Sequence, residues 1–174
     1  MAFREIKSQL DWNEYESFSI KKGHFDDPIE IISHERIRIN YTYPLKINIF
    51  KDSECIIYQT DSTLGGQKDI CCFDDAKVSI LDSLIITGFD RSNISARRSS
   101  AVEANQRCRV DAYDNSVIIA HNDAFASMHD ASHLICGKNR SDRVVGEIWG
   151  LNVTVEAFNN SKIKFKTWRK YNDR

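Results

Sequence analysis

Proline and glycine are scarce in this sequence, with two prolines and seven glycines in 174 residues. A chain with so few of the usual turn formers has to make its turns with Asn, Asp and Ser. No apolar run is long enough to cross a bilayer, and the charged start MAFREIKSQLDW does not resemble a secretory signal peptide. A formal net charge of -1 gives the whole chain no electrostatic attraction to nucleic acid or membrane.

The cysteines do not form an even set that would indicate a disulfide framework. There are five, Cys55, Cys71, Cys72, Cys108 and Cys136, and no C-x2-C spacing occurs among them. The adjacent Cys71 and Cys72 would point to opposite faces of a strand, which does not suit a zinc site. Cys55, Cys108 and Cys136 fall at positions that the repeat described below assigns to the interior. We therefore expect reduced core thiols and a cytoplasmic location.

An eight-residue repeat is visible in VDAYDNSVIIAHNDAFASMHD and extends from Asp74 to Cys136. An apolar column runs from Val78 to Leu134, and a second column, mostly of small residues, follows it two places later. Residues two apart in a strand share a face, so both columns are predicted to point inward. A further column is rich in turn formers: Asp74, Asp82, Asp90, Arg98, Gln106, Asp114, Asn122 and Asp130.

This period indicates an all-β fold. Inward residues at every second position, in units of eight, do not match the helical period of 3.6 residues. A unit of one short strand and a corner suits a single-stranded β-solenoid with two or three units per coil. An ordinary β-sandwich is the structural alternative, since regularly spaced short strands are also typical of that fold.

Solenoid ends need covers, and the first 27 residues are predicted to form a helical cap. Phe3, Ile6 and Leu10 would share one helical face, and Asp11 with Glu14 resembles a capping box. The predicted organisation is a cap at 1–27, a solenoid at 28–167 interrupted by loops 62–69 and 137–152, and a basic tail at 168–174.

Units such as VDAYDNS, VIIAHNDA and VTVEAFNNS resemble the V-x-A-x-D/N-x-S octads of many bacterial and phage proteins that are predicted to be β-solenoids. The resemblance covers roughly residues 70–136 and 153–167. It implies an architecture and no shared activity, so no functional residue is carried over from it. Arg98, Gln106 and Ala126 depart from the pattern.

The sequence offers no recognisable catalytic or metal-binding motif. The turns lack the glycines of calcium-binding nonapeptide repeats, and no G-x-S-x-G or Cys-His signature occurs. His121 and His129, one unit apart, could form a ladder, but solvated histidines are the simpler interpretation. We therefore expect no catalytic residue, no cofactor, no metal and no enzymatic activity. An enzyme acting on polysaccharide or acyl substrates stays as an alternative.

Binding residues are predicted where cations and aromatic side chains occur together in loops, outward columns and the tail. The candidates are Arg140, Arg143, Trp149, Lys162, Lys164, Lys166, Trp168, Arg169, Arg97, Arg107, Arg109 and Tyr113. The expected partner is a protein or a protein–RNA complex, with nucleic-acid contact possible through the basic tail. One specific hypothesis is a phage or mobile-element inhibitor of a host effector such as an RNA-guided (CRISPR) nuclease. A structural, scaffolding solenoid is the alternative.

The inward columns can be tested by enlarging small residues. We expect Ala104→Leu and Ala112→Leu each to lower the free energy of unfolding by about 1–3 kcal/mol, because both would overpack a slim interior. Denaturant titration measures this loss. If both variants are as stable as wild type, the assignment of this column to the interior is wrong.

Overall fold

The computed structural model describes residues 4–22, 28–40, 45–59 and 69–166, which form one helix and 17 strands. The helix α1 spans Gln9–Lys22. The first nine strands are β1 (Arg4–Ile6), β2 (Ile29–Ile31), β3 (Arg36–Asn40), β4 (Ile47–Ile49), β5 (Glu54–Tyr58), β6 (Ile70–Cys72), β7 (Lys77–Leu81), β8 (Ile85–Gly88) and β9 (Asn93–Ala96). The others are β10 (Ala101–Ala104), β11 (Arg109–Ala112), β12 (Val117–Ala120), β13 (Phe125–Met128), β14 (His133–Cys136), β15 (Val145–Ile148), β16 (Thr154–Ala157) and β17 (Lys162–Phe165).

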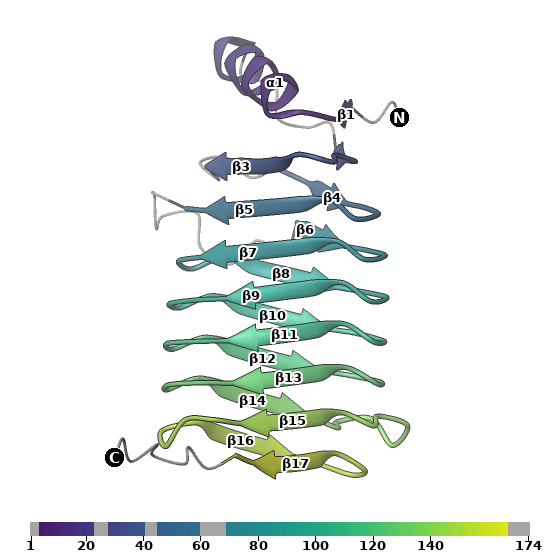
Figure 1. Ribbon diagram of the computed structural model, residues 1–174, viewed down its shortest axis with the longest axis vertical. Helices are drawn as coiled ribbons and strands as arrows, with labels where there is room; N and C mark the ends of the chain where they lie inside the picture. Colours follow the sequence, from purple (N-terminus) through teal and green to yellow (C-terminus); the bar gives the residue numbers. More distant parts are fainter. Residues whose placement is uncertain (1–3, 23–27, 41–44, 60–68, 167–174) are drawn as a thin grey trace, which may run out of the picture.

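The strands form two parallel sheets that face each other, so the predicted β-solenoid is confirmed (Figure 1). Sheet A holds β1 and the even-numbered strands, and sheet B holds the odd-numbered strands from β3 to β17. Val102 of sheet A pairs with Ile118, and Val110 of sheet B pairs with Ala126. The regular register is therefore 16 residues, and each coil contains two eight-residue units.

The interior is made by the columns that the repeat predicted. Val78, Ile94, Val102, Val110 and Ile118 are at most 2% exposed. The companion column of Ala96, Ala104, Ala112 and Ala120 is fully buried and leaves little room between the sheets. A Cβ at Gly88 in β8 would lie 2.7 Å from Cδ1 of Ile94 in β9, which shows how closely the two sheets approach there.

Each coil turns at two corners, here called corner 1 (leading from sheet A into sheet B) and corner 2 (leading from sheet B into sheet A). The corner residues of the Asp-rich column adopt positive φ, from 54° at Asn122 to 73° at Asp82. Arg98 and Gln106 adopt it as well, at 60° and 55°, although they lack the residue types that favour it. The corner therefore has the same backbone conformation at Arg98 and Gln106, where the residue type departs from the repeat.

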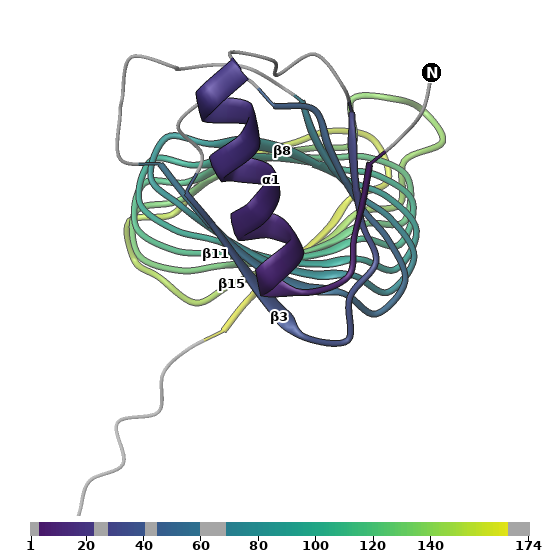
Figure 2. The same cartoon turned by 90° about the horizontal axis from the view of Figure 1, so that it is seen from above.

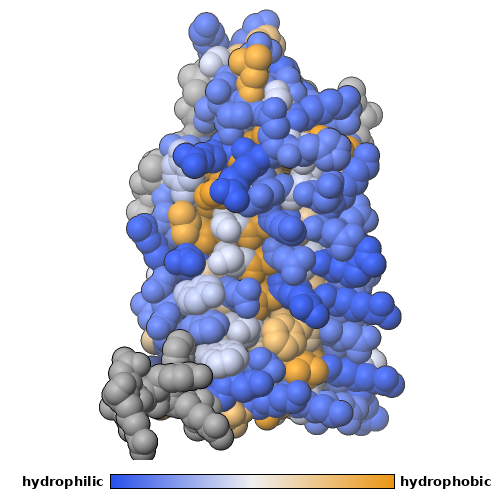
Figure 3. Space-filling model, in the orientation of Figure 1, coloured by the Kyte–Doolittle hydropathy of each residue, from blue (hydrophilic) through white to orange (hydrophobic). Residues whose placement is uncertain are grey.

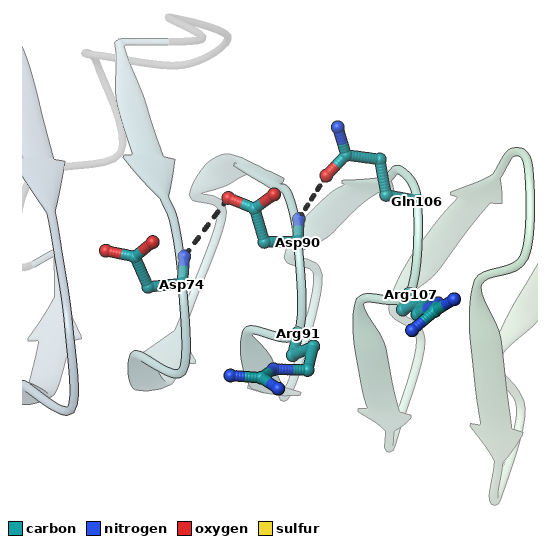
Figure 4. A pocket seen from close by; sticks show the side chains of 5 residues that line it. All are labelled: Asp74, Asp90, Arg91, Gln106 and Arg107. Atoms are coloured by element: carbon teal, nitrogen blue, oxygen red, sulfur yellow. Dashed lines mark hydrogen bonds between the residues drawn. The ribbon is translucent and has the colours of Figure 1, made fainter.

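Side chains at the corners bind the backbone of the neighbouring coil. Asp90 accepts a hydrogen bond from the Asp74 N–H at 3.2 Å, and Gln106 accepts one from the Asp90 N–H at 2.7 Å (Figure 4). At corner 2, Asp114 accepts from the Arg98 N–H at 2.9 Å. These bonds satisfy donors that lie outside the strand pairing and join each coil to the next.

The N-terminal cap differs in detail from the prediction. Ile6 belongs to β1, which extends sheet A by pairing with β2, and Leu10 is 65% exposed, so the proposed helical face is wrong. The capping box pairs Ser8 with Asp11: the Ser8 N–H donates to Asp11, and the Asp11 N–H donates to Ser8 Oγ. Helix α1 lies across the end of the solenoid and buries Trp12 and Tyr15 (Figure 2). Phe3 lies outside the described residues.

The two-unit coil predicts how the fold tolerates deletions. Removing one coil, Arg97–Ala112, joins Ala96 to Tyr113 at an equivalent corner and keeps every later strand in its own sheet. Removing only Arg97–Cys108 shifts later units by half a repeat and places turn formers in the interior. We expect the 16-residue deletion to give the more soluble and more stable protein, measured by soluble yield and thermal unfolding. The opposite order would contradict the register.

Candidate interaction face

The outer face of sheet B collects most of the predicted binding residues. Seven of the twelve point outward from its strands or from corner 2, where the strands end: Arg97, Arg109, Tyr113, Trp149, Lys162, Lys164 and Lys166. Figure 3 shows this face, with hydrophilic side chains along both edges and paler and orange residues along its middle. The sheet thus brings together residues that are up to 69 positions apart in sequence (Lys166 minus Arg97).

Five side chains form a continuous stack along corner 2. The guanidinium of Arg97 lies 4.8 Å from the centre of the Tyr113 ring. The Tyr113 and His129 rings are 4.6 Å apart and inclined by 10°, and the His129 and Trp149 rings are 6.1 Å apart and inclined by 8°. Lys166 Nζ completes the stack 5.6 Å from the Trp149 ring. We call these five residues the corner-2 stack.

Turn chemistry aligns the members of this stack. The carbonyl of Tyr113 accepts hydrogen bonds from the Ser116 N–H at 3.2 Å and from Ser116 Oγ at 2.7 Å. Ser100 and Ser132 bind the carbonyls of Arg97 and His129 in the same way. Because these three turns are held by the same contacts, the side chains of Arg97, Tyr113 and His129 leave the solenoid in the same direction.

The stack could not be recognised from the eight-residue frame alone. That frame assigns Asn105 and His121 to the same outward column as Tyr113 and His129, but the coil places alternate units on opposite corners. The spacing also changes, because the register from Phe125 to Val145 is 20 residues and that from Val145 to Lys162 is 17. A search for a 16-residue period in the sequence would have placed Arg97, Tyr113 and His129 in one outward column.

Part of the segment predicted as a loop at 137–152 is a strand, β15. Its VGEI sequence was not recognised because Gly146 occupies an inward position, where a Cβ would lie 2.8 Å from side-chain atoms of Ile163 and Leu134. Trp149 follows this strand at corner 2. Arg140 and Arg143 lie at corner 1, at the other edge of sheet B (Figure 1), so they do not join the stack. Trp168 and Arg169 lie outside the described residues.

The loop between β14 and β15 is held by Asp142, which sequence reasoning missed. Its buried carboxylate accepts hydrogen bonds from the backbone N–H groups of Asn122 at 2.9 Å and Asn139 at 3.0 Å. Burial opposes ionisation, but these donors and the adjacent His121 outweigh it and lower the pKa of Asp142 below its usual value of 3.8. Asp142 thereby takes the place of the corner residue in its coil.

Arginines also gather at corner 1, in a shallow depression lined by Arg91, Arg107, Asp74, Asp90 and Gln106 (Figure 4). Arg91 forms an ion pair with Asp75 at 2.7 Å. Close by, Arg109 lies 5.8 Å from the centre of the Phe125 ring on sheet B. Acidic and basic groups alternate in this depression, so it has no uniform charge with which to select a ligand.

The described cysteines are not activated. Burial raises the pKa of Cys55 to about 12 and that of Cys108 to about 11, and it also raises those of Cys71, Cys72 and Cys136. A thiol is a nucleophile only as its thiolate, so these residues are poor nucleophiles at neutral pH.

Among the described residues, no group of three or more His, Cys, Asp or Glu side chains could hold a metal ion. His121 and His129 lie at opposite corners and form no ladder. Within the same part of the chain, α1 is neither long nor apolar enough to span a membrane. No family model, curated protein or solved structure matches this sequence.

The contribution of Asp142 to stability should depend on pH. Because its pKa is lower in the folded chain than in the unfolded chain, its stabilisation is fully present above the unfolded value and is lost as pH falls through the folded value. We expect Asp142→Asn to lower the free energy of unfolding by about 1–3 kcal/mol at neutral pH. The difference from wild type should shrink in acid, as the pH falls below 3.8 and through the lower folded value.

Denaturant titrations at both pH values measure this effect. The matched control is Asp111→Asn, which changes an exposed carboxylate on sheet B and should have little effect at either pH. An equal loss for Asp142→Asn at both pH values would contradict the assigned role.

Proposed function

We propose that this chain is a non-catalytic binding protein that contacts a partner protein through the outer face of sheet B. The corner-2 stack is the observation that carries the proposal. Tyr, Trp and Arg are the residues that most often dominate the energy of protein interfaces. Here the stack and its serine-held turns fix them on a rigid scaffold before binding, which reduces the conformational entropy lost on association.

The geometry of the stack favours a protein surface over an unpaired nucleic-acid strand. Base recognition by stacking requires a free aromatic face. The faces of Tyr113, His129 and Trp149 are turned toward one another or toward Arg97 and Lys166. Arg97 is exposed at one end of the stack and suits a carboxylate of a partner protein, whereas Lys166 at the other end pairs with Glu147 at 3.2 Å. The half-buried ring of Tyr113 suits an apolar group of the same partner.

An inhibitor from a phage or mobile element that occupies a host effector, such as an RNA-guided nuclease, is one form of this proposal. Its support is the compact chain, the phage-like octads and the binding face. In this form the contact is made with the protein part of the effector. Any nucleic-acid contact would be an addition through the basic tail.

The binding face is tested by removing the aromatic anchors. We expect the double variant Tyr113→Ala, Trp149→Ala to lose at least tenfold in affinity for its partner, because such anchors typically contribute about 2 kcal/mol or more. Affinity capture from a bacterial lysate with RNA retained, followed by titration of the captured partner, gives the measurement. For the nuclease form, the assay is DNA cleavage by a purified guide-loaded nuclease with and without the chain.

Corner 1 supplies a matched control. Phe50, Phe73 and Phe89 stack there at 4.9 and 5.1 Å, so Phe73→Ala, Phe89→Ala removes two stacked rings away from corner 2. This control should bind as wild type does. If both double variants bind equally well, corner 2 is not the binding site. If RNA alone competes for binding and the affinity falls steeply with salt, the partner is nucleic acid and the proposal of a protein surface is wrong.

A further inference from the structure

The two ends of the solenoid differ in how their apolar interiors are covered. At the N-terminal end, α1 and β1 close the fold, and Ile6 and Trp12 are at most 1% exposed. At the other end, β16 pairs with β14 and β17 with β15, and the opposite edges of β16 and β17 have no partner strand among the described residues.

The last described coil therefore leaves inward positions uncovered. Phe165 is 76% exposed, whereas Ile148, its register partner in β15, is 3% exposed. Ala157 is exposed and Val155 and Ile163 are half-buried, although the residues that pair with Val155 and Ala157 in β14 are fully buried. We call Val155, Ala157, Ile163 and Phe165, with the free edges of their strands, the end face.

We propose that the end face binds the end face of a second copy of this chain, forming a two-fold symmetric dimer. Head-to-tail stacking is blocked because α1 lies across the other end (Figure 2). Of the two ends, the end face is the one at which β16 and β17 both present an unpaired edge among the described residues, and the same face of a second copy offers matching strand edges. Such an isologous contact closes after two subunits and does not extend into a filament.

Charge selects one of the two possible arrangements. If β17 paired with β17 of the second copy, Lys162 and Lys164 would lie against the same lysines, which is destabilising. If β16 pairs with β17 of the second copy, Glu156 lies beside Lys162 and Lys164 of that copy, because all three side chains point outward. Neighbouring strands of a coil run in opposite directions, so this pairing is antiparallel.

The outward lysines and Glu156 are accessible for this contact. Lys162 and Lys164 are exposed, and the Glu156 side chain is 54% exposed while it lies 3.3 Å from His133. Lysines on an edge strand are a common means of preventing unwanted strand pairing. Here Lys162 and Lys164 repel a second β17 and attract β16, whose edge carries the carboxylate of Glu156.

The size of the end face sets the expected affinity. Each strand of the end face has four residues and is about 13 Å long at about 3.3 Å per residue. With sheets about 10 Å apart and side chains on both outer faces, the contact covers roughly 260 Å² per copy. The total of roughly 500 Å² is smaller than that of stable interfaces, so we expect a weak dimer that dissociates on the order of hundreds of micromolar.

Sedimentation equilibrium of the full chain from about 10 μM to 1 mM tests the proposal, a range chosen for a weak dimer. The expected mass rises from that of one chain, 20.1 kDa, to twice that value. Phe165→Asp should abolish the rise, because it places a charge among the apolar residues of the end face. Leu10→Asp, at an exposed apolar residue of α1, is the matched control and should dimerise as wild type does.

Charge exchange tests the strand arrangement itself. Glu156→Lys alone, and Lys162→Glu with Lys164→Glu, should each weaken self-association at least tenfold. Mixing these two variants should restore dimers, because every Lys–Glu contact is then attractive. Combining all three substitutions in one chain should restore them as well. Circular dichroism confirms that each variant keeps its fold.

Several results would overturn the proposal. A wild-type chain that stays monomeric over the whole range would show that the end face binds no second copy, and its own residues 167–174 would be the next occupant to test. Dimers that survive Phe165→Asp would place the contact elsewhere, and open-ended oligomers would contradict the two-fold symmetry. Failure of the mixed variants to associate would exclude the β16–β17 pairing. None of these measurements involves the partner of sheet B, so the two proposals stand or fall separately.

Discussion

The whole structure depends on the corner that the chain makes after every strand. A four-residue strand can stay in register with the next coil only if the chain reverses within four further residues. The positive φ of Asp114 and its equivalents makes this reversal possible, and Asp or Asn tolerates that conformation better than other residues with a Cβ. The side chains of Asp90 and Asp114 then accept hydrogen bonds from the backbone of the preceding coil, so one residue type both turns the chain and joins adjacent coils.

Regular corners have a second consequence, because they align outward side chains as strictly as inward ones. At corner 2, Ser100, Ser116 and Ser132 fix the carbonyls of Arg97, Tyr113 and His129, and these side chains from successive coils then stack. Aromatic pairs of this kind contribute about 0.5–1.5 kcal/mol each beyond the area they bury. The corner-2 stack therefore stabilises the solenoid and also holds a rigid set of aromatic and cationic groups at its surface. A loop bearing the same residues would have to order them on binding.

The insertions lengthen the spacing between paired residues, but β13, β15 and β17 still pair in order within sheet B. The four additional residues between β14 and β15 leave the solenoid at corner 1, and Asp142 returns the chain to its path by accepting the same kind of backbone hydrogen bond that other corner residues accept. This is why Trp149 meets His129 despite the longer spacing. The two ends of the solenoid are not equivalent, since a helix covers one and the last coil presents apolar residues at the other.

The sequence by itself determined the fold class and the inward columns, because strand parity and an eight-residue period leave few ways to bury Val78, Val102 or Ile118. It did not determine the number of eight-residue units per coil, since a coil of two units and a coil of three units would bury the same columns. That number decides which outward residues are neighbours, and only the tertiary structure separated His121 from His129 and joined Tyr113 to Trp149. Strand β15 was missed because Gly146 gives no apolar signal, and the cap was misread because Ile6 pairs within sheet A. Inward positions are set by local periodicity, whereas surface neighbours are set by coil length, which depends on how the two sheets close around the core.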